Sequence, residues 1–245
     1  MPKVYAGTSG WAYPAWKPSF YPPKLSSAKF LGYYASRLNS VELNYTFRRF
    51  PTEKLQIGWG EATPADFKFA VKAHQTITHI KRLRDAGESA SHFIASLQAL
   101  AEANKLGPIL FQLPPFLKCD LPLLSDFLAA LPRYVRTAFE FRHISWFSDD
   151  VFARLRVANV ALCQAQSATI ETPEIATADF SYLRLRKESY SVKDRESIAK
   201  KVAELVKRGD VFVYFKHEET PEGALYAESL LAETSPFNPL DKGSQ

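Results

Sequence analysis

Residues 137–142 read Thr-Ala-Phe-Glu-Phe-Arg, and this stretch contains the pattern that decides the fold. Two large apolar residues alternate with two charged ones, and in a β-strand alternate side chains point to opposite faces of the sheet. One face of this strand therefore carries two aromatic rings, and the other carries Glu140 and Arg142 near its carboxyl end. The stretch predicts a strand whose apolar face is covered by helices and whose charged face belongs to a site.

Similar stretches recur along the whole chain. Short apolar runs alternate with longer segments whose apolar residues recur every three or four positions, the spacing of an amphipathic helix. The pattern predicts eight strands, over residues 4–8, 40–47, 67–72, 109–113, 137–142, 160–164, 182–186 and 211–216. A helix is predicted after each strand, and the one between the sixth and seventh strands, around residues 173–178, is weak.

Strand–helix units in strict alternation predict an α/β fold, a single (β/α)₈ barrel of the TIM type. The 245 residues suit one such domain, with a core over about residues 3–235 and a tail over residues 236–245. An open, doubly wound sheet is the alternative. Residues 7–10, Gly-Thr-Ser-Gly, lack the third glycine of a dinucleotide-binding turn and lead into aromatic residues, which favours the barrel.

The composition limits the classes of partner. The formal net charge of +5 permits an anionic ligand, and no run of Lys and Arg marks a nucleic-acid-binding arm. With only two cysteines, Cys119 and Cys163, neither a disulfide framework nor a cysteine zinc site is predicted. The sequence shows no signal-peptide pattern and no run of ~20 apolar residues. These features predict a cytoplasmic protein without a membrane partner, and they leave its oligomeric state open.

Polar residues collect where a TIM barrel keeps its chemistry, at the carboxyl ends of the strands. Those predicted to point into the barrel there are Glu42, Asn44, Thr46, Lys72, Gln112, Glu140, Arg142, Gln164, Gln166, Arg184, Arg186, Tyr214 and Lys216. Their neighbours along the strands, predicted to face the helices, are Val41, Leu43, Phe139, Phe141, Leu183, Leu185, Val213 and Phe215. Burying many charges is costly unless they pair or meet a ligand, so the pattern predicts a polar, net-positive mouth.

Several motifs in this order resemble the YecE-like family, domain-of-unknown-function family 72 (DUF72). They lie at residues 7–11, 41–47, 77–79, 106–108, 111–115 and 140–146. The resemblance extends from the first strand to the last helix. It implies a TIM-type barrel of this length and a soluble protein of bacterial or archaeal origin, and it implies no particular reaction.

Three positions depart from the pattern of that family. Members often have an aspartate after the sixth strand, where this chain has Gln166, and His-Gly after the seventh, where residues 186–187 are Arg-Lys. A tyrosine that is common after the second strand is Arg48 here. If the aspartate or the histidine is catalytic in relatives, these departures predict a different ligand or a lower activity.

The leading functional hypothesis is an enzyme, a hydrolase or lyase that acts on a phosphate- or sugar-bearing anion. Glu42, Glu140 and His143 are the candidate acid/base groups. The candidate substrate-binding residues are Thr8, Trp11, Asn44, Lys72, His79, Gln112, Arg142, Trp146, Arg184, Tyr214 and Lys216. The competing interpretation of the carboxylates is that they neutralise basic neighbours, Glu140 with Arg142 or Arg184 and Glu42 with Lys72.

Other chemistries are weaker alternatives. His79, His143 and His217 each follow a strand, and with Glu42 or Glu140 they would suit a metal-dependent phosphodiesterase. Their spacing matches no ligand motif, so the leading prediction includes neither a metal nor another cofactor. The aromatic residues of segment 11–21 suit stacking on a sugar or base, whereas its prolines favour an ordered plug on the barrel. The alternative to an enzyme is a protein that binds nucleic acid or a nucleotide through the basic mouth without chemistry.

Overall fold

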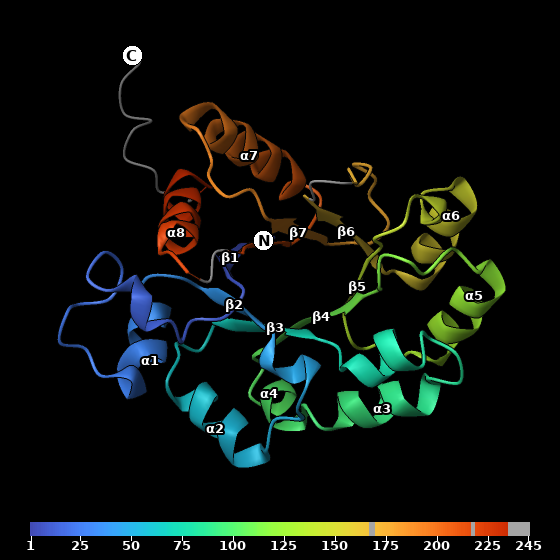
Figure 1. Cartoon of the computed structure of the whole chain (residues 1–245), viewed down its shortest axis with the longest axis horizontal. Coiled ribbons are helices and arrows are strands. Elements are labelled where there is room, and N and C mark those ends of the chain that lie inside the picture. Colours follow the sequence, from blue (N-terminus) through green and yellow to red (C-terminus); the bar gives the residue numbers. More distant parts are fainter. Residues whose placement is uncertain (167–169, 217–218, 235–245) are drawn as a thin grey trace.

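The computed structural model of the chain describes residues 1–166, 170–216 and 219–234, and it contains the predicted barrel (Figure 1). All the ladders between neighbouring strands are parallel, in the order β1-β8-β7-β6-β5-β4-β3-β2. The strands are β1 (Val4–Thr8), β2 (Ser40–Leu43), β3 (Lys68–Lys72), β4 (Leu106–Gln112), β5 (Thr137–Glu140), β6 (Ala161–Ala165), β7 (Ser181–Leu185) and β8 (Val211–Phe215). The TIM-type fold is therefore confirmed.

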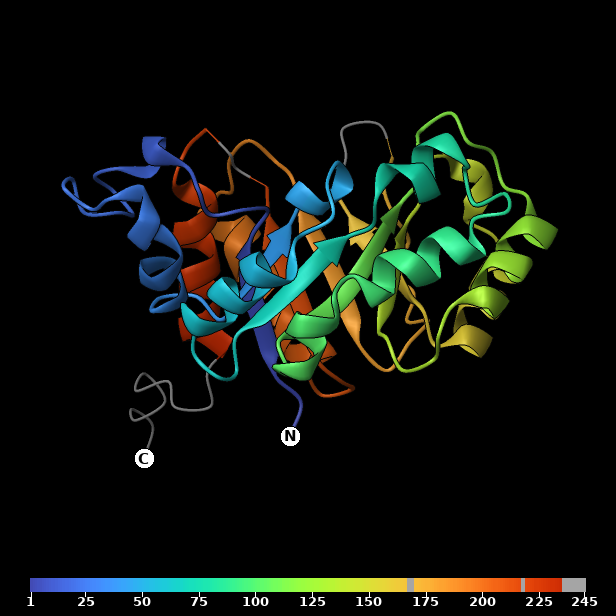
Figure 2. The ribbon, with the colours of Figure 1, turned by 90° about the horizontal axis from the view of Figure 1, so that it is seen from below.

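Helices surround the strands on the outside (Figures 1 and 2). They are α1 (Phe30–Ala35), α2 (Glu53–Glu61), α3 (Gly87–Ala95), α4 (Gln98–Glu102), α5 (Leu121–Ala130), α6 (Asp149–Ala158), α7 (Val192–Leu205) and α8 (Glu222–Thr234). The weak helix predicted around residues 173–178 is absent, and that segment is irregular. Its Pro173 lacks the backbone N–H that a helix interior uses. As a result, no helix occurs between α6 and α7 along the part of the chain that the structure describes.

Local signals in the sequence explain where the long helices begin. Ser148 accepts a hydrogen bond from the backbone of Val151 and starts α6. At α7, Ser191 and Asp194 form a capping box in which each side chain accepts from the other residue's backbone. These caps fix where the loops that follow β5 and β7 end.

The barrel closes between β1 and β2 with side chains in place of most ladder bonds. A single parallel bridge, Ser9 to Glu42, joins the two strands. Elsewhere in the seam, Asn39 bonds to the backbone of Val4 and Ala6, and the Tyr34 hydroxyl accepts from Thr8 N and donates to Ser40 O. Such bonds satisfy backbone groups that would otherwise be buried without partners.

The strand residues divide into two faces as the alternation predicted. All eight residues predicted to face the helices belong to the large core between strands and helices. A smaller cluster fills the barrel interior, with Tyr5 and Phe212 stacked near its amino end and Cys163, Tyr182 and Tyr214 above them. In Figure 2 the strands rise from the end where the N-terminus lies, so the mouth is at the upper end. Figure 1 looks onto this mouth.

The aromatic segment 11–21 packs beside the barrel rather than across its mouth. Trp16 is fully buried and contacts Phe20 and Tyr21, and Tyr21 stacks on Phe30 of α1. The segment is therefore ordered as expected, but it lies at the side of the barrel (Figure 1), so the expectation that it plugs the barrel is wrong. Its first aromatic residue, Trp11, is half-buried against Trp59 of α2.

Candidate functional site

A buried cluster of one arginine and two glutamates lies at the carboxyl ends of the strands. Arg184 of β7 donates from Nη2 to Glu42 Oε1 at 2.7 Å and from Nη1 to Glu140 Oε2 at 2.5 Å. None of the three side chains is more than 2% exposed. The competing interpretation from the sequence, in which the carboxylates neutralise basic neighbours, thus holds for Glu140 with Arg184. The expected pairing of Glu42 with Lys72 is wrong, because Glu42 pairs with Arg184 and Lys72 bonds to Gln112.

Both oxygens of Glu42 also accept hydrogen bonds from other residues. Ser9 Oγ donates to Oε1 at 2.8 Å, and the Tyr182 hydroxyl donates to Oε2 at 2.7 Å. Burial raises the pKa of Glu42, but the charge of Arg184 and the hydrogen bonds from Arg184, Tyr182 and Ser9 outweigh it, so its pKa is lowered. Glu42 is therefore held as a carboxylate with hydrogen bonds on both oxygens, which is poorly suited to a general acid.

Glu140 connects the buried cluster to the surface of the mouth. Gln112 Nε2 donates to its Oε1 at 2.9 Å, and Arg186 Nη2 lies 3.1 Å from both of its oxygens. Gln112 in turn accepts from Lys72 Nζ at 2.8 Å. A cavity of about 20 Å³ beside Glu140 and Arg142, room for about one water, opens next to this carboxylate.

Lys72 is the lysine of the mouth, and its pKa is strongly lowered. Its ammonium lies 4.2 Å from the centre of the Phe47 ring, and burial, followed by the charge of Arg184, lowers its pKa to about 8. The His79 ring packs edge-to-face with the Phe47 ring, and the two ring centres are 4.9 Å apart. Its pKa is lowered by burial and then by the charges of Lys72 and Arg142.

Basic side chains outnumber acidic ones at the mouth. Two carboxylates, Glu42 and Glu140, face four basic groups, Lys72, Arg142, Arg184 and Arg186. Arg142 is half-buried and makes no hydrogen bond or ion pair with any residue that the structure describes. Three buried atoms also lack a described hydrogen-bond partner there, namely Asn44 Oδ1, Arg184 Nε and Arg186 Nε. Such atoms usually meet a ligand or water.

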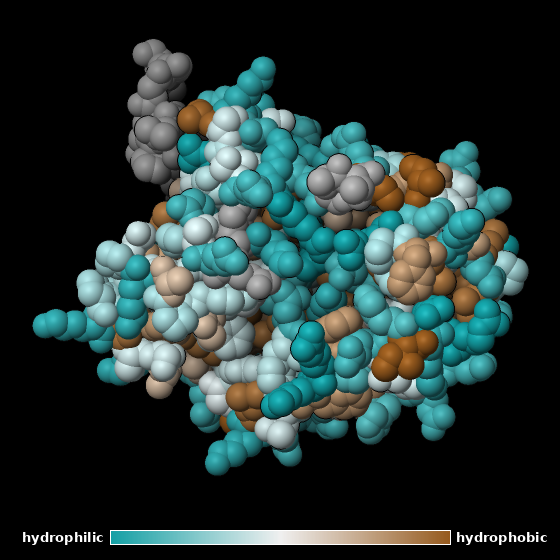
Figure 3. Space-filling model, viewed as in Figure 1, coloured by the Kyte–Doolittle hydropathy of each residue, from teal (hydrophilic) through white to brown (hydrophobic). Residues whose placement is uncertain are grey.

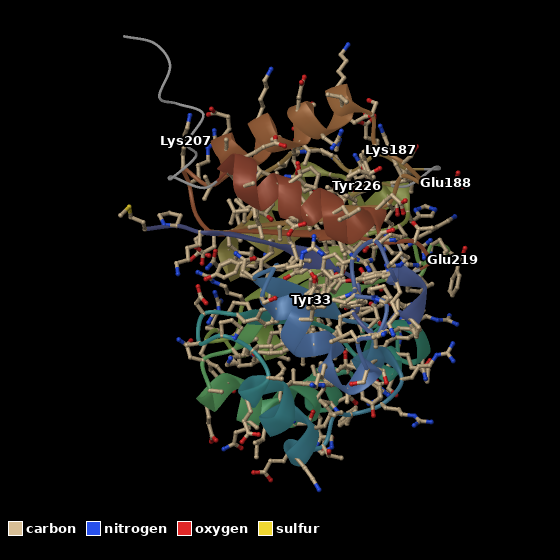
Figure 4. The ribbon with its side chains drawn as sticks, turned by 90° about the vertical axis from the view of Figure 1, so that its left-hand side faces the viewer. Tyr33, Lys187, Glu188, Lys207, Glu219 and Tyr226 are labelled. Carbon is tan, nitrogen blue, oxygen red and sulfur yellow. The ribbon has the colours of Figure 1, made fainter. Side chains whose placement is uncertain are left out.

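The surface of the molecule over the mouth is hydrophilic (Figure 3). Figure 3 shows a mostly hydrophilic centre over the strand ends, with hydrophobic side chains gathered mainly toward the α3, α5 and α6 side. In Figure 4, Lys187, Glu188 and Glu219 lie at this end of the molecule, and Lys207 lies at the other. Lys187 is paired with Asp194 at 2.8 Å.

The structure places several of the candidate residues away from the mouth. Thr8 points outward and bonds to Gly10 O and the Tyr34 hydroxyl, because β1 directs Ser9 rather than Thr8 into the barrel. Tyr214 is fully buried below the cluster and bonds to Ser40. Trp146 is 1% exposed and stacks on Phe141.

Other candidates have local structural roles or lie at the edge of the site. His143 Nδ1 accepts from Ser145 N at 3.2 Å and so caps a short helical turn. Lys216 is exposed after β8. Thr46 lies beyond the end of β2, where its hydroxyl bonds to the backbone of Leu43 and Lys72. His217 lies outside the described residues.

The two glutamines at the carboxyl end of β6, Gln164 and Gln166, also lie elsewhere than predicted. Because Ala161, Cys163 and Ala165 face the interior, Gln164 faces outward. It lines a cavity of about 420 Å³ on the outer face of β6 and β7, together with Gln166 and Arg186. Gln166 accepts from the Tyr190 hydroxyl at 2.6 Å.

Two residues of the cluster, Ser9 and Tyr182, were missed by sequence reasoning. Both sit at even spacing from interior positions, Ser9 two residues beyond Gly7 and Tyr182 two before Arg184. The period of the strands was therefore a signal for both.

Neither a metal centre nor a membrane segment emerges from these elements. Within residues 1–166, 170–216 and 219–234, no three His, Cys, Asp or Glu side chains come together as metal ligands. None of the helices in those ranges is long and apolar enough to cross a bilayer.

The fold and the site define a TIM-type barrel with a buried Glu–Arg–Glu cluster beneath a basic mouth. The chain belongs to the family described as "Protein of unknown function DUF72", whose model matches residues 5–242.

Two curated relatives share part of the sequence. The UPF0759 protein YunF of Bacillus subtilis (strain 168) is 34% identical over 155 residues, which are 59% of this chain and 52% of that protein. The UPF0759 protein YecE of Escherichia coli (strain K12) is 32% identical over 146 residues, 59% of this chain and 50% of that protein. The match thus spans about half the length of these relatives.

Solved structures share the fold over nearly the whole chain. A DUF72 family protein from Thermotoga maritima MSB8 has a TM-score of 0.83 at 27% identity, covering 93% of this chain and 97% of that one. An AP endonuclease of family 2 from Brucella melitensis has a TM-score of 0.52 at 11% identity, with 97% and 99% covered. This second likeness concerns the barrel fold alone.

Proposed function

We propose that this chain is an enzyme, a hydrolase or lyase, that binds a phosphate- or sugar-bearing anion at the basic mouth of the barrel. The observation that carries the proposal is the excess of basic groups there, above all Arg142, which has no described ion-pair partner. A guanidinium presents its donors in a planar fork that matches phosphate and carboxylate oxygens. Arg142 and Arg186 hold the anion in this proposal.

Lys72 is the group best suited to move a proton. With a pKa of about 8, its amine is present in both protonation states near neutral pH. A general acid or base is most efficient when its pKa lies close to the working pH. Gln112 fixes the position of Nζ, and the same amide anchors Glu140. Glu140 then orients Arg186 toward the anion.

Glu42 and Arg184 act as positioning residues in this scheme. Their charged groups are buried in contact with each other, so the pair holds Glu140 in place from below. Asn44 Oδ1, which is buried and has no described partner, accepts a hydrogen bond from a hydroxyl of the substrate.

Thermal unfolding with inorganic phosphate and with nucleoside monophosphates tests the binding step. Ligands that bind only the folded state raise the Tm, so the wild-type Tm should rise with phosphate concentration. Arg142→Ala should remove most of that rise. Arg133→Ala, at an exposed arginine bonded only to Val157 O among the described residues, is the matched control and should keep it. An equal rise in the Arg142 variant contradicts the site.

The catalytic step is tested on a panel of phosphate esters and glycosides, with product release as the readout. A compound that the wild type turns over should lose turnover with Lys72→Met while still shifting the Tm. Unchanged kcat in that variant would remove Lys72 from the chemistry.

A further inference from the structure

A groove next to the mouth has the features of a nucleic-acid site. It lies between the segment after β3, which leads into α3, and the segment after β4, which leads into α5 (Figure 1). Its volume is about 720 Å³. The residues that line it are Ile80, Lys81, Arg82, Arg84, Asp85, Phe116, Leu117, Lys118, Asp120 and Leu123.

The charges of the groove are unbalanced. It contains four basic side chains and two acidic ones, and no ion pair among them occurs in the described chain. One of the acids, Asp120, is engaged in capping α5 through a hydrogen bond from Leu123 N at 3.0 Å. Arg84 and Lys118 are both exposed. The groove therefore offers cations at its surface to an anionic chain.

The groove also presents apolar and aromatic surface to solvent. Phe116 is 63% exposed and Ile80 is 66% exposed. The Arg82 guanidinium lies 5.0 Å from the centre of the Phe116 ring. An exposed ring beside cations is the arrangement on which unpaired bases stack, whereas a site for phosphate alone needs no such ring.

The backbone holds this edge of the groove in an unusual conformation. A π-helical turn, Thr76–Ile80, precedes it, and Arg82, Leu83 and Asp85 have φ values of 52°, 72° and 48°. Non-glycine residues rarely adopt this left-handed region, and it tends to persist at functional sites. Leu83 is buried and anchors the loop, which leaves its neighbours Arg82 and Arg84 exposed.

A continuous series of contacts joins the groove to the mouth. Lys72 lies over the Phe47 ring, Phe47 packs on His79, and His79 O accepts from Arg82 Nε at 3.4 Å. Arg82 then reaches Phe116. A ligand that extends from Arg142 past His79 would therefore enter the groove.

We infer that the groove binds single-stranded nucleic acid, with its phosphates on Arg84 and Lys118 and a base on Phe116. The inference deepens the proposed function, because it makes a phosphodiester-linked strand the substrate class of the mouth. Double-stranded nucleic acid is excluded as the ligand of the groove, since its bases are stacked on each other and offer no free face to Phe116.

Fluorescence anisotropy with a labelled oligothymidylate of about 12 nucleotides tests the site. The wild type should bind in low salt and weaken as salt increases. Phe116→Ala should weaken binding about tenfold, as expected for one lost stacking contact. The slope of log K against log salt is negative, and the double variant Arg84→Glu/Lys118→Glu should make it shallower by about 1.4.

Two control variants separate the groove from general effects of charge and aromatic loss. Lys193→Glu/Lys200→Glu makes the same charge change on α7, on the other side of the barrel, and should bind more tightly than the groove double variant. Tyr134→Ala removes an 83% exposed ring near the amino end of β5 and should bind as the wild type does. Equal weakening by the groove and control variants overturns the inference.

Three further outcomes are decisive. No binding of the oligonucleotide by the wild type overturns the inference, while a Tm rise with phosphate that depends on Arg142 leaves the proposed function standing. If the oligonucleotide binds through the groove and Arg142→Ala does not change the Tm rise with phosphate, the assignment of the groove stands and the proposed function is overturned. An oligoglutamate of equal charge that binds as tightly overturns the assignment to nucleic acid.

Discussion

Arg184 and Glu42 form a direct ion pair at 2.7 Å although their strands, β7 and β2, are not neighbours in the sheet. The pair therefore spans the barrel interior and ties its two sides together. The same guanidinium holds Glu140 of β5, so one side chain links three strands. In a buried cluster of this kind each charge depends on the others for its solvation.

Removing Arg184 should strongly destabilise the protein. Arg184→Met leaves two buried carboxylates without their shared partner, and we expect the free energy of unfolding to fall by roughly 3–5 kcal/mol. Urea unfolding followed by circular dichroism measures the loss. The exposed control Arg133→Met should change stability by less than about 0.5 kcal/mol. A loss below 1 kcal/mol in the Arg184 variant would mean that the carboxylates find other partners.

Glu42 should make stability depend on pH in the acid range. Its pKa is lowered in the folded state, so the unfolded chain binds more protons as the pH falls below about 4.5, the ordinary value. The stabilisation is complete above that pH and is lost as the pH falls through the lowered pKa. Glu42→Gln should reduce the slope of unfolding free energy against pH there, by up to ~1.4 kcal/mol per unit. Glu204→Gln, at a 72% exposed carboxylate, should leave the slope unchanged.

The fold followed from the sequence because burial obeys a simple period. The alternation in residues 137–142 reappears in β7 and β8, and every residue predicted to face the helices does so. Strand ends were less well predicted. The strand expected over residues 40–47 stops at Leu43, since Thr46 bonds to the backbone of β3 instead of continuing the strand.

The site was predicted only in part, because spacing assigns a face but not a partner. Glu42, Glu140 and Arg184 were expected at one end of the barrel, yet nothing in the sequence indicates that both carboxylates would pair with Arg184. Which residues pair depends on distances across the barrel interior. Thr8 was misplaced for a related reason, since the first strand directs Ser9 inward and one residue of shift reverses the face.

The seam between β1 and β2 should be sensitive to small changes. A Cβ on Gly7 would lie 1.9 Å from Ser40 O and 2.6 Å from the Tyr34 hydroxyl, so Gly7→Ala forces the two strands apart. Tyr34→Phe removes a hydroxyl that bonds to Thr8 N and Ser40 O, and should cost roughly 1–3 kcal/mol of stability. Thermal unfolding measures both losses. Tyr33→Phe, one position earlier on α1, is the control, and an equal loss there would contradict a special role for Tyr34.

Lys72 should titrate far below an ordinary lysine and respond to anions. Between its folded pKa of about 8 and the ordinary 10.5, the unfolded state binds more protons, so stability should rise with pH across that window. NMR of the ¹³C-dimethylated protein measures the titration directly, with Lys72→Met identifying the signal and Lys193 serving as an exposed reference. Phosphate at the mouth favours the charged amine, and we expect it to raise the pKa of Lys72. That rise should vanish in Arg142→Ala if the two groups share one anion. A signal that titrates near 10.5 and ignores phosphate would show that Lys72 is an ordinary solvated lysine, and proton transfer at the mouth would then need another group.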